Sequence, residues 1–229
     1  MDVERVRSDL AEKGYSYLPD LPPTADFLGE CRRLGRPMAQ YGGELVRDIK
    51  VDPRVSRDQV SAYNTSELTP HTEWYEFPDL PPRFVALRCV TPAAGEGGET
   101  TLADGYRMLA SFSHPRADWL YSDERVWGSA GLRYQGIASE PSRHPILARH
   151  GQTTVIRFSS TDLLANDDLV SSYIQHGRTY FAEKHVAIDI APDAMLIWDN
   201  WRMLHARRKF ADPARHLQRV LIGTPAVTG

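Results

Sequence analysis

Short strand-like segments, separated by Pro, Gly, Asp and Asn, make up most of the sequence from Glu44 onward. Frequent short strands with turn residues between them are typical of antiparallel all-β domains, because neighbouring strands can pair through tight connections. The pattern therefore favours a mainly β sandwich or barrel. The strands are expected at 44–51, 83–90, 100–104, 124–130, 153–158, 185–190, 194–199 and 217–223.

Three helices are expected to flank this β core. Apolar residues at helical spacing predict a helix from Val3 that stops at Gly14, and a second helix over about 28–34. The longest amphipathic segment is 166–184, and Asn166 stands in the position of an N-cap. The helices are too few to form a core of their own, so we expect them to cover the sheets.

The chain shows no internal repeat, low-complexity stretch or linker that would divide it. Its 229 residues are within the range of one large β domain. We therefore expect a single domain over 1–229, with the N-terminal helices of about residues 1–40 packed on the β core.

The charge and composition of the chain limit which partners and which cellular location are expected. Lys and Arg number 27 against 30 Asp and Glu, a net charge of −3, so no basic excess favours a nucleic acid. No apolar run approaches the roughly 20 residues that span a bilayer, and the charged N-terminus lacks the apolar core of a signal peptide. Cys31 and Cys89 are too few for a disulfide framework and suit a reducing compartment. We expect a cytoplasmic protein with no nucleic-acid or membrane partner, and the sequence leaves its oligomeric state open.

The segment TPHTEWYE (69–76) places His71 two residues before Glu73. On an extended segment, residues two apart point to the same side, so this imidazole and this carboxylate would lie side by side. They are two of the three donors of a non-haem iron(II) face, which a second histidine would complete. Such pairs also arise by chance, and alone this one favours a structural role.

A second histidine lies in the segment LIWDNWRMLHARRKFADPARHLQRVLI (196–222). There His205 follows an apolar strand and a turn, and Arg215 and Arg219 follow four residues apart, on one side of a further strand. If the chain folds back through the intervening turn, the arginines lie beside His205. A metal would then hold one end of a dicarboxylate and a guanidinium the other.

The basic residues around His205 allow another interpretation. Arg207, Arg208 and Lys209 form a short run of positive charge, and such a run is usually a solvated turn. We interpret these three residues in that way. Arg215 and Arg219 flank the apolar run of a strand, where a purely solvated role fits less well.

The glycines of GEGGETTLADG (95–105) suggest a phosphate-binding loop, but no Lys–Ser/Thr pair follows and no helix is expected to open there. A turn that feeds a strand is the better interpretation. Thr100 would then present its hydroxyl to the interior, where it could complete the hydrogen bonding of a carboxylate beside an arginine.

The succession of H-T-E, P-x-x-G-x-G-G-E-T, W-D-N-x-x-x-x-H-A and two arginines four apart resembles the iron(II)/2-oxoglutarate dioxygenases of the taurine dioxygenase and clavaminate synthase type. The match runs from about Tyr63 to Ile222, and the order and spacing of the motifs are more specific than any one of them. The resemblance implies a double-stranded β-helix, or jelly roll, with the site inside its mouth.

The same resemblance implies the roles of six residues. His71, Glu73 and His205 look like the iron ligands. Thr100 and Arg215 match the positions that bind the distal carboxylate of 2-oxoglutarate. Arg219 matches a position near the metal-bound end of this cosubstrate, or one that reaches an anionic group of the substrate. The resemblance leaves open whether Arg215 and Arg219 exchange these roles.

By this analogy Fe(II), 2-oxoglutarate and O2 are the cofactor and cosubstrates. Because the carboxylate of Glu73 occupies the third ligand position, we expect stereoselective hydroxylation of an unactivated C–H bond rather than halogenation. Desaturation, epoxidation or cyclisation at the same iron remain alternatives. The expected substrate is a small polar molecule such as an amino acid, free or tethered to a carrier protein, in specialised, antibiotic-type biosynthesis.

The candidates to line the substrate pocket are residues close in sequence to the presumed ligands. Aromatic walls with one acid and a few polar groups suit a small zwitterion, although the tryptophans could equally be core residues. The candidates are Tyr63, Asn64, Ser66, Glu67, Trp74, Trp201, Arg202 and Arg219.

Two other classes of protein remain as hypotheses. A non-redox, cupin-like metalloenzyme would explain the histidines and Glu73, but it gives no role to Thr100, Arg215 and Arg219. A binding protein that has lost its chemistry would be expected to show a damaged ligand set, whereas all three ligands are present.

Overall fold

The computed structural model describes residues 1–22, 24–40, 42–55, 62–122, 124–127, 133–134, 137–138, 142–164 and 167–224. The helices are α1 (Val3–Lys13), α2 (Phe27–Arg32), α3 (Gly105–Ser111), the 3-10 turn η1 (Ala117–Leu120) and α4 (Asp168–Lys184). The strands are β1 (Tyr15–Leu18), β2 (Pro37–Met38), β3 (Arg47–Lys50), β4 (Leu68–His71), β5 (Phe84–Thr91), β6 (Thr100–Asp104), β7 (Arg125–Trp127), β8 (Arg133–Tyr134), β9 (Ile137–Ala138), β10 (Ser142–His144), β11 (Leu147–His150), β12 (Thr153–Ile156), β13 (Val186–Ile188), β14 (Met195–Asp199), β15 (Met203–Arg207) and β16 (His216–Ile222).

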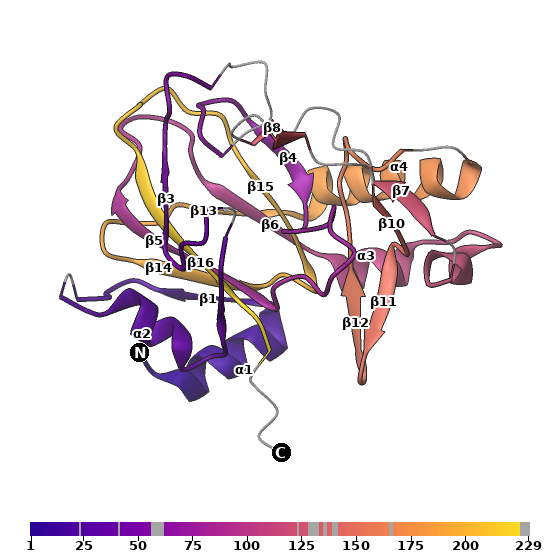
Figure 1. The fold of residues 1–229 in the computed structure, drawn as a ribbon, viewed down its shortest axis with the longest axis horizontal. Helices are drawn as coiled ribbons and strands as arrows, with labels where there is room; N and C mark the ends of the chain where they lie inside the picture. The colour runs from indigo at the N-terminus through magenta and orange to yellow at the C-terminus, as the bar shows by residue number, and fades with distance from the viewer. Residues whose placement is uncertain are drawn as a thin grey trace.

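Two antiparallel sheets dominate the fold (Figure 1). The larger sheet has six strands in the order β1-β14-β5-β16-β2, with β3 paired to β16 as well. The smaller has four strands in the order β13-β6-β15-β4, so β4 is an edge strand. Three two-stranded ribbons complete the described strands: β10-β7, β11-β12 and β8-β9.

Helices α1 and α2 cover the outer face of the six-stranded sheet, on the side of β1 (Figure 1). Val6 and Leu10 of α1 and Cys31 of α2 pack against residues of β5, β14 and β16 that alternate along these strands, such as Ala86 and Ile197. This alternation is the period-two pattern of a strand, and it leaves the intervening residues for the opposite face.

The residues between the two sheets form a second core cluster. Val85, Leu87, Trp198 and Leu217 of the larger sheet meet residues of the smaller sheet such as Leu102. Since strand residues two apart share a face, Arg219 is expected on the same inner side as Leu217. The layer between the sheets is therefore where the polar residues of the site can meet.

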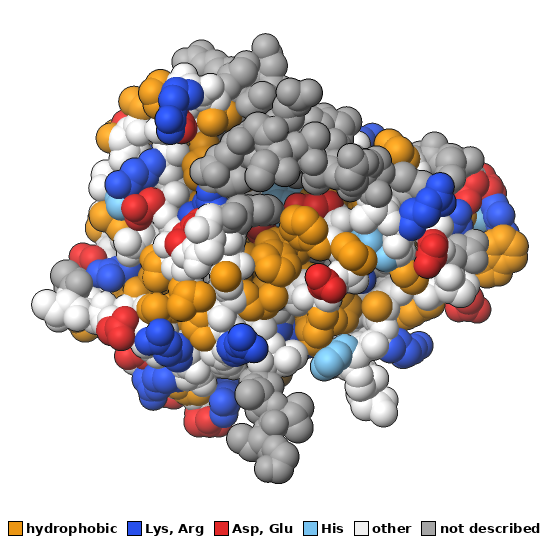
Figure 2. Space-filling model, in the orientation of Figure 1, with side chains coloured by type: hydrophobic (Ala, Val, Ile, Leu, Met, Phe, Trp, Pro, Cys, Tyr) orange, Lys and Arg blue, Asp and Glu red, His pale blue; other side chains and the backbone are white. Residues whose placement is uncertain are grey.

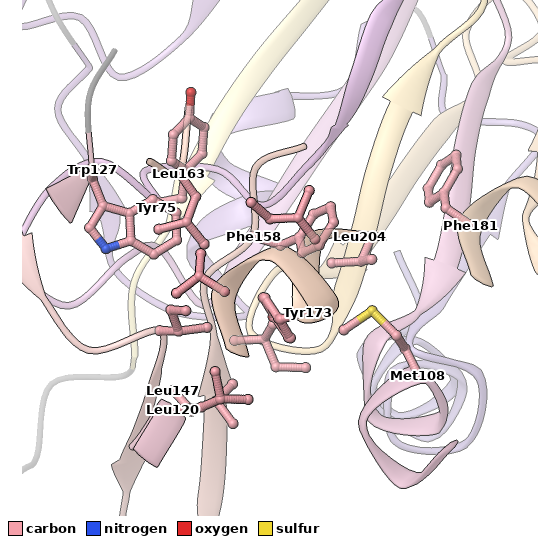
Figure 3. Close-up of a cluster of buried hydrophobic side chains, with 14 of the residues drawn as sticks. Tyr75, Met108, Leu120, Trp127, Leu147, Phe158, Leu163, Tyr173, Phe181 and Leu204 are labelled. Atoms are coloured by element: carbon pink, nitrogen blue, oxygen red, sulfur yellow. The ribbon is translucent and has the colours of Figure 1, made fainter. Parts of the chain in front are cut away.

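Helix α4 covers the outer face of the four-stranded sheet. Tyr173 and Phe181 of α4 belong to a cluster with Leu204 of β15 and with Phe158 (Figure 3). The order of layers is helices, six-stranded sheet, four-stranded sheet and helix, and the two sheets enclose the inner layer.

The helix limits have local causes. Asp2 caps α1 by accepting from the backbone N–H of Arg5, and Gly14 ends the helix with φ 83°, a conformation that glycine adopts without a Cβ penalty. Asp167 caps α4 by accepting from the N–H of Val170. Asn166, the expected cap, lies outside the described residues.

The expected strands agree well with the observed ones. Each expected segment contains or overlaps a strand, and residues 128–130 of one segment lie outside the described ranges. Strands β4 and β15, which carry the candidate histidines, were not among the expected strands. One expectation was wrong: a helix, α3, does open at Gly105, because Asp104 accepts from the N–H groups of Tyr106 and Arg107. Strand β6 separates α3 from the glycines of 95–98, so these still form no phosphate loop.

Among the helices of the described ranges, none combines the length and the hydropathy that a membrane crossing requires. On the face of the molecule in Figure 2, basic side chains are interspersed with acidic ones.

A substitution at Gly177 tests the packing of α4. A Cβ there would lie 2.3 Å from the ring of Phe158, so Gly177→Ala forces the helix and the ring apart. Although alanine favours a helix, we expect the free energy of unfolding to fall by about 1–3 kcal/mol through overpacking. Urea unfolding measures this, with Gln175→Ala on the exposed side of α4 as the control. A Gly177→Ala protein as stable as the wild type would contradict this packing.

Candidate metal centre

Strands β4 and β15 bring the two candidate histidines together. His71 and His205 are direct partners in the antiparallel register of these strands, and their ring centroids are 4.2 Å apart. Partners on neighbouring strands point to the same face, so both imidazoles enter the same space between the sheets.

Glu73 completes the group two residues after His71. One ligand atom from each of these three residues lies within 4.8 Å of the others, and Nε2 of His205 is 3.9 Å from Oε2 of Glu73. Glu73 and His205 are buried. The structure thus brings together the three residues that the sequence put forward as ligands.

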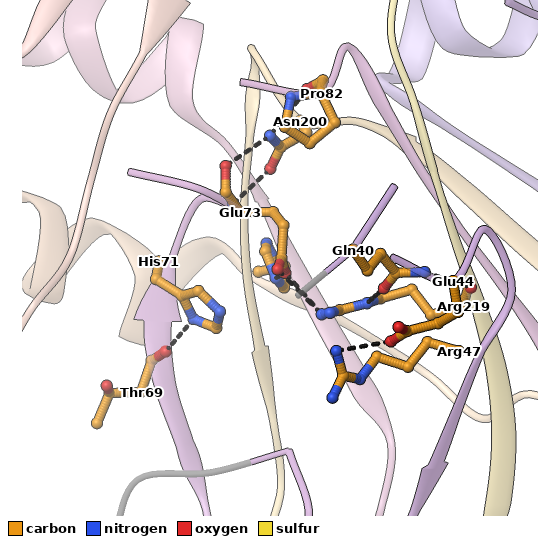
Figure 4. Close-up of polar contacts among 10 residues, drawn as sticks. Gln40, Glu44, Arg47, Thr69, His71, Glu73, Pro82, Asn200 and Arg219 are labelled. Carbon is orange, nitrogen blue, oxygen red and sulfur yellow. Dashed lines mark hydrogen bonds and ion pairs between the residues drawn. The ribbon is translucent and has the colours of Figure 1, made fainter. Parts of the chain in front are cut away.

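The hydrogen bond of His71 sets the orientation of its ring. Nδ1 lies 2.8 Å from the carbonyl oxygen of Thr69 (Figure 4). A carbonyl can only accept, so in the neutral ring the proton is on Nδ1 and the lone pair is on Nε2. This is the tautomer that a histidine ligand requires, with its other nitrogen held by a backbone carbonyl.

His205 lies deeper than His71. Burial is the main cause that holds the pKa of His205 well below its usual range, and the neighbouring His71 and Arg219 add to the effect, which favours the neutral imidazole. Its ring packs 5.0 Å from that of Trp198. Among the described residues, Nδ1 of His205 has no hydrogen-bond partner.

The backbone of Glu73 is held by the buried amide of Asn200. Oδ1 of Asn200 accepts from the Glu73 N–H at 2.7 Å, and Nδ2 donates to the Glu73 carbonyl at 3.0 Å (Figure 4). Nδ2 also donates to the carbonyl of Pro82 at 3.0 Å. Asn200 is in the turn between β14 and β15, so this clamp connects the turn before His205 to the segment that carries Glu73.

Trp74 follows Glu73 with a backbone φ of 62°, in the left-handed region that bulky residues avoid. Such strain persists only where the surroundings fix it, and the clamp on the Glu73 carbonyl lies directly before it. The indole of Trp74 packs 5.5 Å from the ring of Phe77 and against the core between the sheets.

The carboxylate of Glu73 points toward Arg219 (Figure 4). Nη1 of Arg219 donates to both oxygens of Glu73 at 3.0 Å, and its Nε donates to Oε1 of Gln40 at 2.9 Å. Both partners of this ion pair are largely buried, so it is weakly screened by solvent. A metal at this site would share the carboxylate with a fixed guanidinium.

A second arginine and a tyrosine adjoin this pair. Arg47 pairs with Glu44 at 2.7 Å, and its guanidinium carbon lies 5.3 Å from the ring centroid of Tyr63. Burial raises the pKa of Tyr63, while the charges of Arg219 and Arg47 oppose this rise. The phenol of Tyr63 therefore lies near the charged side of the site.

Arg215 and Thr100 lie further along the inner layer. Arg215 is buried, its Nη2 donates to the carbonyl of Gly98 at 2.9 Å, and its guanidinium carbon lies 5.1 Å from the ring centroid of Phe210. Within the described ranges no carboxylate forms an ion pair with it, and burial lowers its pKa. Thr100 is also buried, two residues after Gly98.

Arg207 was wrongly interpreted as part of a solvated turn. It is buried, with a relative exposure of 4%, and its guanidinium donates to the carbonyls of Ala62, Asn64 and Ser66. The sequence held a signal for this: Arg207 is two residues after His205, so on a strand both face inward. Arg208, which alternates with it, is exposed as expected.

The remaining pocket candidates of the segment before β4 differ in exposure. Asn64 is buried and its Oδ1 accepts from the N–H of Ser66 at 3.0 Å, while Ser66 is half-buried. Glu67 is exposed. The segment 62–66 thus packs on β15, and Glu67 lies at its solvent side.

Two pocket candidates, Trp201 and Arg202, need correction. Trp201 is a buried core residue whose Nε1 donates to the carbonyl of Pro81 at 2.9 Å. Arg202 pairs with Asp104 at 2.6 Å and donates to the carbonyl of Ala11, at the end of α1. A strand rises about 3.3 Å per residue, so residues that precede β15 lie well away from His205 even though they are close in sequence.

Two imidazoles from neighbouring strands and one carboxylate from the turn after β4 form the donor set of a facial non-haem iron site. The sequence matches the family described as "Taurine catabolism dioxygenase TauD, TfdA family" over residues 1–221. The chain belongs to this family.

The curated relatives include gamma-butyrobetaine dioxygenase of Homo sapiens. It is 24% identical over an alignment of 219 residues, and the match covers 86% of this chain and 55% of the relative. The enzyme of Pongo abelii matches with the same values. The chain thus spans about half the length of the curated relatives it matches.

Solved structures share the fold. An asparagine oxygenase in complex with Fe(II), 2S,3S-3-hydroxyasparagine and succinate superimposes with a TM-score of 0.81 at 19% identity, covering 97% of this chain and 79% of that chain. The non-heme iron oxygenase OrfP with Fe, succinate and (3S)-hydroxy-L-Arg gives 0.74 at 18% identity, covering 99% and 81%. PvcB from Pseudomonas aeruginosa gives 0.67 at 20% identity, covering 97% and 80%.

Removal of the Asn200 amide tests the clamp on Glu73. Asn200→Ala leaves a buried N–H and a buried carbonyl of Glu73 without this partner, so the carboxylate is less well placed. We expect the affinity for Mn(II), measured by calorimetry, to fall about 10–100-fold. Asn64→Ala removes a buried amide that does not hold Glu73 and should leave this affinity unchanged. Equal affinity in the Asn200→Ala protein would contradict a role in placing the ligand.

Arg219→Met tests the competition between the guanidinium and the metal. The variant leaves Glu73 without its cation, so the metal-free protein should lose about 3 kcal/mol or more of stability. The same change removes a positive charge beside a divalent cation, so the Mn(II) affinity should rise about ten-fold or more. Thermal unfolding with and without Mn(II), and calorimetry, measure both effects. Arg88→Met, which breaks a pair with Asp193 elsewhere, is the control, and a weaker Mn(II) affinity in Arg219→Met would oppose this account.

Proposed function

We propose that this protein is an Fe(II)- and 2-oxoglutarate-dependent oxygenase that hydroxylates an unactivated C–H bond of a small polar substrate. One observation carries the proposal: His71, Glu73 and His205 place ligand atoms within 4.8 Å of one another in the inner layer between two sheets. Arg215 is buried in the same layer and has no acidic partner among the described residues. This supports a binding site for the cosubstrate 2-oxoglutarate.

The architecture supports this assignment. We infer that the two main antiparallel sheets are the halves of a double-stranded β-helix, and that α1 and α2 belong to the same single domain. The packing of both helices on β5, β14 and β16 supports the second inference.

The donor set fits iron(II). His71 offers a lone pair on Nε2, His205 is neutral, and the carboxylate of Glu73 lies beside both. Two imidazoles and one carboxylate on one face of an octahedron leave three positions for other ligands. The residues present are therefore those that would hold the metal.

Arg215 fits the distal carboxylate of 2-oxoglutarate. A guanidinium that is buried with one backbone hydrogen bond retains donors for an anion, and a charged hydrogen bond in a desolvated site is strong. We propose that Arg215 binds this carboxylate and that the hydroxyl of Thr100 donates a hydrogen bond to it. Arg219, near the ligands, would contact the metal-bound end of 2-oxoglutarate or an anionic group of the substrate.

When bound, Fe(II) and 2-oxoglutarate supply the capacity to activate O2 for insertion into a C–H bond. The protein's own residues bind and orient the metal and the cosubstrate, and they enclose the site. Arg215 and Thr100 fix the direction of the cosubstrate, Asn200 fixes Glu73, and the burial of Glu73 and His205 excludes water.

The proposed substrate is an amino acid, free or tethered to a carrier, in a biosynthetic role. The phenol of Tyr63 lies on one side of the metal centre beside two guanidinium groups, Arg47 paired with Glu44 and Arg219 paired with Glu73. The O–H and N–H donors of this group suit a carboxylate-bearing molecule. The titles of similar structures name hydroxylated asparagine and arginine as bound molecules. Desaturation, epoxidation or cyclisation would use the same residues.

A non-redox, cupin-like metalloenzyme is the alternative class. It would use the same histidines and Glu73. It leaves Arg215 unexplained, since burying a guanidinium without an anion costs free energy that a cosubstrate carboxylate would recover.

An absorption experiment tests the metal and cosubstrate together. Under anaerobic conditions, wild-type protein with Fe(II) and 2-oxoglutarate should show a weak visible charge-transfer band, and His205→Ala should abolish it. His216→Ala is the matched control, because this histidine lies at the other face of β16, 2.7 Å from Asp48. Tight zinc binding with no such band in the wild type would favour the cupin-like alternative.

Arg215→Gln tests the cosubstrate site. Since a hydrogen bond to a charged group contributes about 1.5–3 kcal/mol, the Kd for 2-oxoglutarate should rise roughly 10–150-fold. Calorimetry with Mn(II)-loaded protein measures it, and Arg208→Gln, at an exposed neighbouring arginine, should leave it unchanged. An unaltered Kd in the Arg215→Gln protein would mean that another residue binds the distal carboxylate of 2-oxoglutarate.

A further inference from the structure

Arg207 has a position that neither the metal centre nor the proposed cosubstrate site requires. It ends β15 on the face of His205 and is the direct register partner of Thr100 on β6. Neighbouring partners on adjacent strands lie within contact of each other, so Arg207 adjoins the residue proposed for the distal carboxylate. Its guanidinium turns instead toward the segment 62–66.

Every carbonyl of the segment 62–66 is hydrogen-bonded. Arg207 donates to Ala62 at 3.1 Å, to Asn64 at 2.9 Å and to Ser66. The N–H of Asp52 donates to the carbonyl of Tyr63 at 2.7 Å, and the N–H of Phe210 to that of Thr65 at 3.1 Å. One guanidinium thus holds three of five consecutive carbonyls, which fixes the course of an otherwise irregular segment.

This segment carries a side chain of the proposed substrate pocket. The ring of Tyr63 lies against Arg47, and Tyr63 interacts electrostatically with Arg219 and Glu73. The position of this phenol at the metal centre therefore depends on the hold of Arg207 on the backbone at either side of it.

Arg207 also interacts electrostatically with Arg215. The guanidinium carbons of Arg207 and Arg215 lie 5.0 and 5.1 Å from the centroid of the same ring, that of Phe210. Burial and the charge of Arg215 lower the pKa of Arg207 to about 9. Two like charges in one desolvated region repel, and an anion bound to one of them relieves this repulsion for the other.

We propose that Arg207 is a positioning residue that couples the cosubstrate site to the segment 62–66, so that a carboxylate bound at Arg215 strengthens the hold of Arg207 on this segment and orders Tyr63 at the metal centre. The proposal rests on the proposed function. The coupling is reciprocal. A change that weakens the hydrogen bonds from Arg207 to the segment therefore weakens the binding of 2-oxoglutarate by the same factor.

Amide hydrogen exchange of the wild-type protein is the first test. With Mn(II)-loaded protein under anaerobic conditions, saturation by 2-oxoglutarate should slow exchange over residues 62–66 by about five-fold or more. Calorimetry on the same sample establishes that the cosubstrate is bound. This comparison needs no substitution, so it decides the question even if a variant at this buried position does not fold.

Three variants separate charge from geometry. Arg207→Met should speed exchange over 62–66 without ligand, abolish the slowing by 2-oxoglutarate and raise the Kd for 2-oxoglutarate about five-fold. Arg207→Lys keeps the charge but not the planar fork, so it should retain most of the affinity while the segment exchanges faster. Arg208→Met, at the exposed neighbour that pairs with Glu99, should change none of these.

The outcomes distinguish the two proposals. Wild-type protein that binds 2-oxoglutarate without any slowing over 62–66, or Arg207→Met that keeps the slowing, overturns the coupling alone. Wild-type protein that does not bind 2-oxoglutarate overturns the coupling and the proposed function together.

Discussion

The hydrogen bonds between the amide of Asn200 and the backbone of Glu73 are the interaction on which the site depends. They connect the turn between β14 and β15 to the segment after β4, so the strand of one imidazole is tied to the residue that supplies the carboxylate. The amide satisfies both backbone groups of Glu73, which would otherwise be buried at a cost of about 1–3 kcal/mol each. The left-handed backbone of Trp74 directly afterwards shows how closely the chain is held there.

The inner layer of the sheets is positively charged although the whole chain carries −3. Arg47, Arg207, Arg215 and Arg219 are buried or largely buried there, whereas two carboxylates, Glu44 on Arg47 and Glu73 on Arg219, pair with them. Guanidinium groups remain charged when desolvated, so such a layer attracts small anions that can enter it. A dicarboxylic cosubstrate and a substrate with a carboxylate fit this field better than a neutral ligand does.

Two periodicities predict part of the fold and of the site from sequence. Period two predicts that His71 and Glu73 lie together, although the structure achieves this through a turn after β4, and helical spacing locates α1 and α4 closely. The complete ligand set followed from the resemblance to a known family. The pairing of His205 with His71 depends on the register of β4 and β15, two strands outside the expected ones. Trp201 and Arg202 were misjudged because closeness in sequence was taken for closeness in space. Arg207 was misjudged because a run of basic residues was treated as one unit, whereas alternation along the strand separates its members.

The place of β4 at the edge of the four-stranded sheet has a mechanical consequence. Of the strands in that sheet, only β15 is its ladder neighbour, with one further bridge from His71 to Ser159. Beyond this ladder, the segment of His71 and Glu73 is held from outside the sheet: the N–H of Thr72 donates to Phe158, the N–H of Ser160 donates to Pro70, and Asn200 clamps Glu73. His205, in contrast, lies between paired strands on both sides. The two imidazoles are therefore fixed in different ways, and a change at Phe158 or Ser160 acts on the His71 side of the site through backbone contacts that His205 does not share.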